Sequence, residues 1–588
     1  MTLAADTRRR FLAHFTAAGL GGTLAPGVLW ARMQDAGTDR VTLAMLTDAL
    51  KLSGIELSEE DRQAMVEGAN TSLERLEALR ALHIPNDVSP PYHFSPVVAG
   101  MRVDRTREPW MMSKAPALKR PAQLEDVALW PVRHLAELVR TKQVTSVELT
   151  RMYLARLHRH QPRLNHVVTF LDDHGLAEAG RADTEIAAGR YKGPLHGIPW
   201  GCKDIITVKG YKTTWGSPAF TEQQLDYDAS IVEMLHEAGA VLIAKLTTGE
   251  LAAGDNWFGG QTKSPWDPTQ GSSGSSAGPA SATAAGDVAF AIGTETSGSI
   301  LSPAARCGLV GLRPTFGRVS RFGAMALSWT QDRLGPFCRH AEDCALVMQA
   351  IARPDGRDMS VTEVPFNWNA SLDVRGLKVG ILQASFDELT EPAAKANAAA
   401  TLDALKALGV REFIPVPVPD FDYDVSAIGV ESGAFFDEHA RAGRMARSRH
   451  RGRPNGRLVS AVDFLQTQRA RMMMMEALAR ATAHVDVYVV ASNSIGRGGP
   501  GGPPAPRAPG TPRPPRTPQP PGQRHFQMAN LAGYPAVNVP NGFTGEGGTP
   551  TSIVFYAQPY REHQLLALAK AYQDRARWHE RRPTALDA

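Results

Sequence analysis

The chain has little of what marks several specialised protein classes. Only four of its 588 residues are cysteine, at positions 202, 307, 338 and 344, and none forms a Cys-x-x-Cys pair, which excludes a disulfide scaffold. It has no uninterrupted apolar run of about 18 residues, so no transmembrane helix and no stable membrane insertion are predicted. The net charge of +4 is small for this length, and it gives no warrant for a nucleic-acid partner.

The bulk composition is that of a soluble globular protein. Apolar residues make up 43% and charged residues 21% of the chain. The length exceeds that at which a single core usually stops growing, but it still allows one large α/β domain with appendages.

The first 36 residues resemble an export signal. In "TRRRFLAHFTAAGLGG", Arg8 and Arg9 precede Phe11 and Leu12 in the twin-arginine pattern, and a mildly apolar stretch follows. The pattern predicts a periplasmic or secreted protein, or a cytoplasmic one if the signal is not used. An ordinary basic amphipathic helix is the alternative.

Residues 37–129 read as an N-terminal extension. Leucines at 43, 46, 50 and 52 fall near one helix face, and Ser58 with Asp61 resembles a capping box before a second helix. Repeated prolines in 84–122 predict an extended connector.

Residues 130–588 alternate between helical and strand-like patterns. Apolar runs of strand length, "HVVTFL", "AVLIAKL", "VAFAIG", "LKVGIL" and "VDVYVVAS", are separated by helical stretches, and Thr145 opens a helix that should end before Pro162. The pattern predicts an α/β domain whose mixed central sheet is covered by helices on both faces. Residues 496–523, rich in Pro, Gly and Arg and without an acidic residue, are expected to form a disordered or extended surface loop.

Three stretches together supply the groups that amide hydrolysis needs. They are "GPLHGIPWGCKD" (193–204), "GSSAGPASATAAG" (274–286) and "GTETSGSILSPAARCGLVGLRPTFGRVS" (293–320). They contain serine nucleophiles, a lysine base and glycine-rich backbone that can present N–H donors to an oxyanion.

These stretches resemble the amidase signature family, whose catalytic set is a Ser-cisSer-Lys triad. "GTETSGSI" matches the nucleophile segment and implies Ser299 as nucleophile, Ser275 lies 24 residues earlier at the cis serine, and Lys203 follows "GIP" at the lysine position. The resemblance implies a cis bond between Gly274 and Ser275. We also expect the backbone N–H groups of the turn to form an oxyanion hole; its residues are Thr296, Ser297, Gly298 and Ser299. Three further residues are expected to support the site: Gly274, Ser276 and Asp204.

The chemistry that follows is that of a serine amidase (EC 3.5.1 type) with no cofactor and no metal, acting on a small-molecule amide. Lys203 has to be neutral to accept a proton, so burial has to lower its pKa from about 10.4 by roughly three units. Esters and carbamates pass through the same tetrahedral geometry, so the sequence does not choose among these substrates.

The sequence departs from the family pattern at some positions and also allows other interpretations. Ser297 replaces a glycine before the nucleophile, and Glu295 replaces an aspartate. "GSSAG" at 274–278 also fits G-x-S-x-G, which would make Ser276 the nucleophile of an esterase like the α/β-hydrolases. A second alternative is the glutaminase-type subunit of an amidotransferase. A homodimer is left open.

Overall fold

The computed structural model describes residues 41–52, 58, 59, 61–63, 65, 66, 69, 70, 93–421, 423–450, 456, 459–491, 519–544 and 548–586. The predicted export signal at 1–36 and most of the predicted loop at 496–523 lie outside these residues. Residues 521–523 are described, and there the prediction of a loop is wrong. They form the first turn of helix α17 (Pro521–Leu531), which starts with proline at a position where a missing N–H costs nothing.

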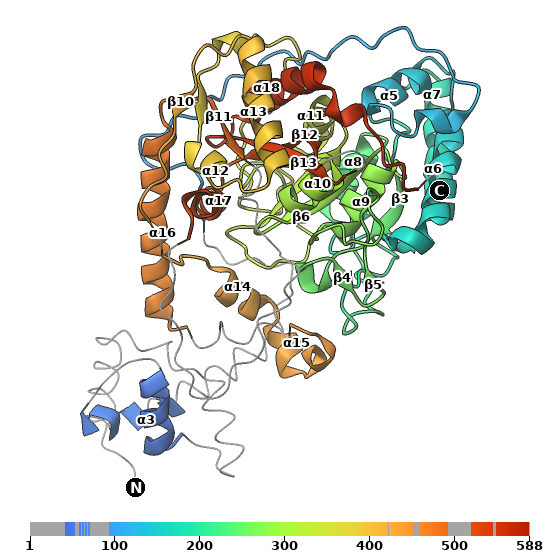
Figure 1. Ribbon diagram of the computed structural model, residues 1–588. Helices are drawn as coiled ribbons and strands as arrows, with labels where there is room; N and C mark the ends of the chain where they lie inside the picture. Colours follow the sequence, from blue (N-terminus) through green and yellow to red (C-terminus); the bar gives the residue numbers. More distant parts are fainter. Residues whose placement is uncertain are drawn as a thin grey trace. The chain divides into compact units, whose positions relative to one another are not determined.

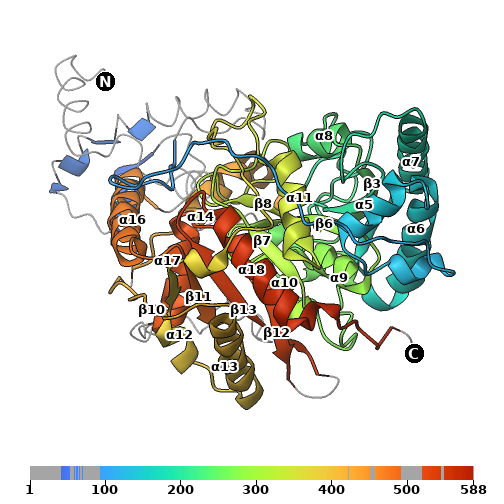
Figure 2. The same ribbon diagram turned by 90° about the horizontal axis from the view of Figure 1, so that it is seen from above.

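An 11-stranded mixed sheet forms the centre of the larger of two compact units, with helices on both faces (Figures 1 and 2). Its order is β1-β3-β2-β6-β8-β7-β12-β13-β11-β9-β10. The bounds are β1 Val167–Phe170, β2 Pro199–Lys203, β3 Val241–Leu246, β6 Phe290–Glu295, β7 Val310–Arg313, β8 Arg333–Cys338, β9 Val379–Ile381, β10 Ile414–Pro415, β11 Val487–Ala491, β12 Ala536–Phe543 and β13 Pro550–Ala557. A small hairpin pairs β4 (Asn256–Trp257) with β5 (Gly260–Gln261). The predicted α/β fold with a mixed central sheet is therefore confirmed.

Strand β2 runs parallel to both of its neighbours. Cys202 pairs with Lys245 of β3 on one side and with Ile292 of β6 on the other. All five residues of β2 are buried, as expected for a strand covered on both faces. This central place puts Lys203, the last residue of β2, next to the carboxyl end of β6, where the "GTETSGSI" segment leaves the sheet.

Helices of very different composition surround the sheet. α9 is built only from small residues and proline, and every one of its residues is buried. The bounds are α5 Val132–Arg140, α6 Ser146–Leu164, α7 Asp172–Ala187, α8 Ser230–Glu237, α9 Ala277–Ala285, α10 Leu301–Cys307, α11 Ala341–Ile351, α12 Gln383–Asp387, α13 Pro392–Ala407 and α18 Glu562–Ala576. None of the helices in the described residues is both long and apolar enough to cross a bilayer.

Helix α6 begins as predicted and ends later than predicted. Thr145 forms a capping box with Glu148, but the helix continues through Pro162 to Leu164. Pro162 falls in the last turn, and Asn165 then ends the helix in the left-handed conformation. A proline this close to the end disturbs little helix beyond it, so its usual helix-breaking effect is limited.

The boundary between the two compact units differs from the one predicted at residues 129 and 130. The larger unit takes in 91–325, 330–423 and 474–588. Residues 91–122 of the connector belong to it, and backbone donors of this segment are satisfied there: the Met111 N–H donates to the Trp368 carbonyl (2.9 Å), and the Ser113 N–H to Glu342 (2.8 Å).

The smaller unit takes in the N-terminal region up to residue 90, 326–329 and 424–473. Its helices include α3 (Leu43–Leu52), α14 (Ile428–Phe435) and α15 (Asp437–Arg441), and helix α16 (Ala461–Thr482) has residues in both units. In the predicted second helix of the extension, the Asp61 N–H donates to the Ser58 hydroxyl (3.1 Å), which in turn donates to the Asp61 carboxylate (2.7 Å). The first of these bonds is one half of the predicted capping box.

Candidate active site

Lys203 is held at the end of a central strand and is fully buried. Its Nζ donates to Ser275 Oγ (2.7 Å) and to Thr294 Oγ1 (2.9 Å). Burial lowers the pKa of Lys203 to about 7, although the carboxylates of Asp332 and Glu295 act in the opposite direction. A lysine with this pKa is about half neutral at pH 7 and largely neutral at pH 8, so it can accept a proton.

Ser275 follows Gly274 across a cis peptide bond, as the family resemblance implied. No other residue type fits at 274, because a Cβ there would lie 1.9 Å from the carbonyl oxygen of Gly254. The Ser275 carbonyl accepts from the Gly249 N–H (3.1 Å). The small residues of this segment therefore allow two backbone segments to approach closely and hold the Ser275 hydroxyl against the lysine.

Ser276 has a structural environment. Its hydroxyl donates to the Thr294 carbonyl (3.0 Å) and accepts from the Thr294 N–H (3.1 Å). The hydroxyl is therefore engaged both as donor and as acceptor by the backbone near the end of β6. The side chain is fully buried. These contacts disfavour Ser276 as a nucleophile and make it a brace between the segments that carry Ser275 and Ser299.

Ser299 lies in the turn between β6 and α10. Its carbonyl accepts from the Ser276 N–H (3.3 Å), which brings the two serine segments together. In the part of the chain that the structure describes, the Ser299 hydroxyl makes no hydrogen bond, including none to Ser275, and its side chain lies at 9% exposure. Gly298 has φ +83°, a conformation that favours glycine.

The four predicted oxyanion-hole residues differ in exposure. Ser297 is exposed, whereas Thr296, Gly298 and Ser299 are buried. Within the described residues, the backbone N–H groups of Ser297, Gly298 and Ser299 donate to no protein acceptor. They are therefore free to donate to a substrate oxygen.

Glu295 anchors the far side of this turn. Its carboxylate accepts from the N–H groups of Ile300 (2.8 Å) and Leu301 (3.0 Å) and pairs with the buried Arg313 (2.9 Å). Burial acts to raise the pKa of Glu295, but Arg313 and Arg333 outweigh it and hold that pKa below its ordinary value. The carboxylate thus stays charged and holds the two residues that follow Ser299. Sequence reasoning noted Glu295 only as a departure from the family pattern.

The comparisons with known proteins show the family of the chain. The family model described as Amidase matches residues 148–566. The chain belongs to the amidase family. It is 34% identical over 491 residues to a glutamyl-tRNA(Gln) amidotransferase subunit of Methylococcus capsulatus, covering 77% of this chain and 99% of that protein.

Solved structures of the amidase family superpose on most of the chain. The native peptide amidase from Stenotrophomonas maltophilia matches with a TM-score of 0.63 and 29% identity, over 79% of this chain and 100% of that one. An inhibitor-bound structure described as a vestigial protein complex that reveals the origins of an s-triazine catabolic enzyme matches with a TM-score of 0.66 and 27% identity, over 76% and 99% of the two chains.

Asp204, which was predicted to support the site, contacts a neighbouring lysine and not the three candidate catalytic residues. Its carboxylate lies 2.9 Å from Lys245 Nζ and accepts from the Thr214 N–H (3.0 Å). Lys245 also donates to the Lys212 carbonyl (2.6 Å). All of these contacts tie Lys245 into the structure, so it is not a second base.

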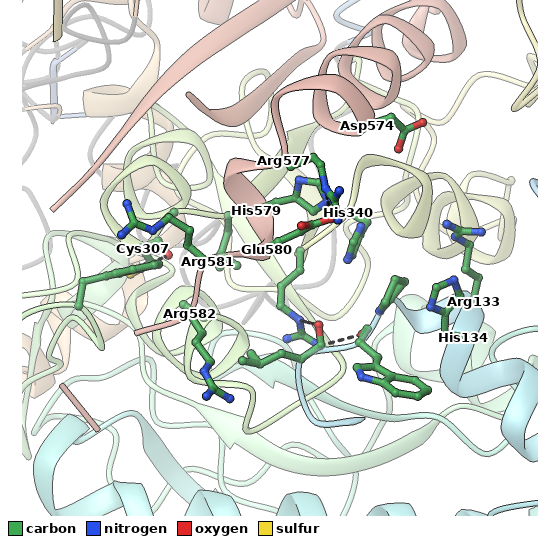
Figure 3. Close-up of a pocket in the computed structure, with 18 of the residues that line it drawn as sticks. Arg133, His134, Cys307, His340, Asp574, Arg577, His579, Glu580, Arg581 and Arg582 are labelled. Atoms are coloured by element: carbon green, nitrogen blue, oxygen red, sulfur yellow. Dashed lines mark hydrogen bonds and ion pairs between the residues drawn. The ribbon is translucent and has the colours of Figure 1, made fainter. Parts of the chain in front are cut away.

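A cavity of about 530 Å³ lies at the opposite end of α10 from Ser299, next to Cys307 and Gly308 (Figure 3). His340 and His579 stand side by side within it, with their ring centroids 4.6 Å apart. None of Lys203, Ser275 and Ser299 lines this cavity. The cavity therefore belongs to another part of the unit.

Thr294 is a site residue that the motif contained but sequence reasoning did not single out. When Lys203 is neutral, an N–H donated to Thr294 leaves the lone pair of the amine facing the Ser275 hydroxyl. We expect Thr294→Val to lower kcat by about tenfold even at pH 9, because the loss of one hydrogen bond of about 1 kcal/mol frees the amine to rotate. Steady-state kinetics across pH would measure this.

Thr283→Val is the matched control for that variant. Thr283 is fully buried in α9, and its hydroxyl has no hydrogen-bond partner among the described residues. It should keep wild-type kcat. Equal rates for both variants would contradict the orienting role of Thr294.

Proposed function

We propose that the protein hydrolyses the C–N bond of a carboxylic amide through an acyl-enzyme on Ser299. The observation that carries this proposal is the fully buried Lys203, with its pKa near 7, in hydrogen-bond contact with the hydroxyl of Ser275. A buried lysine that shares its amine with a serine hydroxyl is arranged to move a proton.

In the proposed mechanism, Lys203 takes the proton of Ser275 while Ser275 takes that of Ser299. The Ser299 oxygen attacks the amide carbonyl, and the backbone N–H groups of the 296–299 turn receive the negative charge that develops on oxygen. Ser275 then gives its proton to the leaving nitrogen and takes back the proton held by Lys203, so the C–N bond breaks, an ester to Ser299 remains and the lysine is neutral again. Water hydrolyses this ester by the same relay. The same steps apply to esters and carbamates.

A second candidate is a glutaminase-type subunit that supplies ammonia to an amidotransferase. It is favoured by the curated relatives, which are named as subunits of glutamyl-tRNA(Gln) amidotransferase and are matched over nearly their whole length. Both candidates use the same site and differ in substrate and partner. Export through the twin-arginine signal that we propose would separate the protein from charged tRNA and favour an independent amidase.

A substrate panel tests the proposal and separates the two candidates. We expect ammonia release from at least one primary amide among free glutamine, a C-terminally amidated peptide and an aliphatic amide. An aryl amide, an ester and a carbamate complete the panel. With hydroxylamine present, the acyl group should be trapped as a hydroxamate, because an acyl-enzyme can be intercepted by a second nucleophile.

Turnover of glutamine together with co-purifying subunits would favour the amidotransferase role, and turnover of the other amides by the isolated chain would favour the independent amidase. Hydrolysis that never yields hydroxamate would contradict the acyl-enzyme.

A further inference from the structure

Two side chains hold Thr296, one through its carbonyl and one through its hydroxyl. The Thr296 carbonyl accepts from Asn530 Nδ2 (2.5 Å), and the Thr296 hydroxyl donates to Asp332 Oδ1 (2.5 Å). Asn530 belongs to α17, which lies more than 200 residues along the chain from this turn. Thr296 is buried, whereas the next residue, Ser297, is exposed.

Fixing the Thr296 carbonyl also fixes a donor of the proposed oxyanion hole. The C=O of Thr296 and the N–H of Ser297 belong to one planar peptide unit and point in opposite directions when that unit is trans. Among the described residues, the cis peptide bond lies elsewhere, between Gly274 and Ser275. A donor that holds the carbonyl on the protein side therefore directs the Ser297 N–H to the other side, where it has no protein acceptor among the described residues.

The orientation of the Asn530 amide is itself determined by charge. Its Oδ1 accepts from Arg313 Nη1 (3.2 Å) and from Arg333 Nη2, and a guanidinium can only donate. The amide nitrogen therefore has to face Thr296. Asn530, Arg313 and Arg333 are all at most 2% exposed, so water does not compete for these bonds.

Arg313 also links Asn530 to the other end of the turn. Arg313 pairs with Glu295, whose carboxylate holds the N–H groups of Ile300 and Leu301. One buried network thus fixes the turn before and after Ser299.

We propose that Asn530 is a positioning residue that aims the Ser297 N–H at the oxyanion of the tetrahedral intermediate; this inference rests on the proposed function. Asn530 acts through the Thr296–Ser297 peptide and touches neither substrate nor nucleophile. Its contribution is greatest when the carbonyl oxygen carries full negative charge, so it should affect kcat more than KM.

Asn530→Asp isolates this role. A carboxylate of the same shape still accepts from Arg313 and Arg333, but it presents an acceptor to the Thr296 carbonyl in place of a donor. We expect kcat to fall by about 30- to 100-fold, less than the 10²- to 10³-fold loss typical of a deleted oxyanion donor, with KM changed less than threefold. An aldehyde analogue of the substrate forms a tetrahedral adduct on the nucleophile, and the affinity of the variant for it should fall by the same factor as kcat. The affinity for a non-reactive substrate analogue should stay unchanged.

Asn538→Asp is the matched control. Asn538 on β12 is also fully buried, and its Nδ2 donates to a backbone carbonyl, that of Leu309 (2.9 Å), away from the turn. Its substitution should lower the melting temperature but leave kcat and aldehyde affinity near those of the wild type. If Asn530→Asp does not fold, Thr296→Val, which removes the Thr296 side-chain bond to Asp332 and leaves the Asn530 amide in place, should give a smaller loss that is again confined to kcat.

The variants separate the positioning role of Asn530 from the amidase activity on which it depends. Wild-type kcat in Asn530→Asp, or equal losses of aldehyde and substrate-analogue affinity, would overturn the positioning role. Full turnover in Ser299→Ala would overturn the proposed function instead, whatever the Asn530 variants do.

Discussion

Replacement of Ser299 by alanine is expected to lower kcat by about 10⁴-fold or more, at unchanged fold and melting temperature. The hydroxyl makes no hydrogen bond among the described residues, so its removal costs the folded state little. It also removes the only atom that can form the proposed acyl-enzyme, and loss of a serine nucleophile in enzymes that work as a triad costs on this scale. Product formation from the best substrate of the panel would measure the effect, with mass spectrometry to detect the acyl adduct on the wild type.

Ser276→Ala is the informative control, because the sequence alone also allowed Ser276 as the nucleophile. Its two hydrogen bonds to Thr294 are structural, so we expect a loss of stability of about 1–3 kcal/mol and a fall in kcat of tenfold at most. A larger loss of activity in Ser276→Ala than in Ser299→Ala would reverse the assignment of the two serines.

Local sequence was sufficient to predict several strands around the site. The runs around β1, β3 and β6 are apolar and of strand length, and the structure has strands there. The central strand β2 has the sequence "PWGCK", which contains proline, glycine and a charged residue and has no strand pattern. Its position follows from pairing with both β3 and β6, a tertiary effect that overrides local propensity.

The roles of the supporting residues could not be derived from the motif. Asn530 lies more than 200 residues from Thr296, and Arg313 lies within the quoted 293–320 stretch but reaches Asn530 and Glu295 only in the folded sheet. A buried arginine or asparagine in a single sequence resembles any surface one. Glu295 carried a usable signal, since an acidic residue just before a helix start is a common partner for free backbone N–H groups.

Replacement of Lys203 by methionine should abolish most activity and change how stability depends on pH. We expect kcat to fall by at least about 10³-fold, because no other group among the described residues contacts Ser275 Oγ to accept its proton. For the wild type, kcat/KM should rise with pH through about 7 and then level off, as the amine loses its proton. A wild-type profile that is flat between pH 6 and 9 would contradict a lysine base.

The stability effect has a definite sign. The folded-state pKa of Lys203 is about 7, below its ordinary value of 10.5, so between these two pH values the unfolded chain binds more protons than the folded one. The free energy of unfolding of the wild type therefore gains a contribution of about 1.4 kcal/mol per pH unit across that window, and loses it again as pH falls towards 7. Lys203→Met lacks this contribution, so its stability relative to the wild type should be most favourable at pH 7 and below and should decline as pH rises towards 10.5. Denaturant unfolding of both proteins at several pH values would measure the difference, and a constant difference would show that Lys203 keeps its ordinary pKa in the folded protein and cannot act as the neutral base.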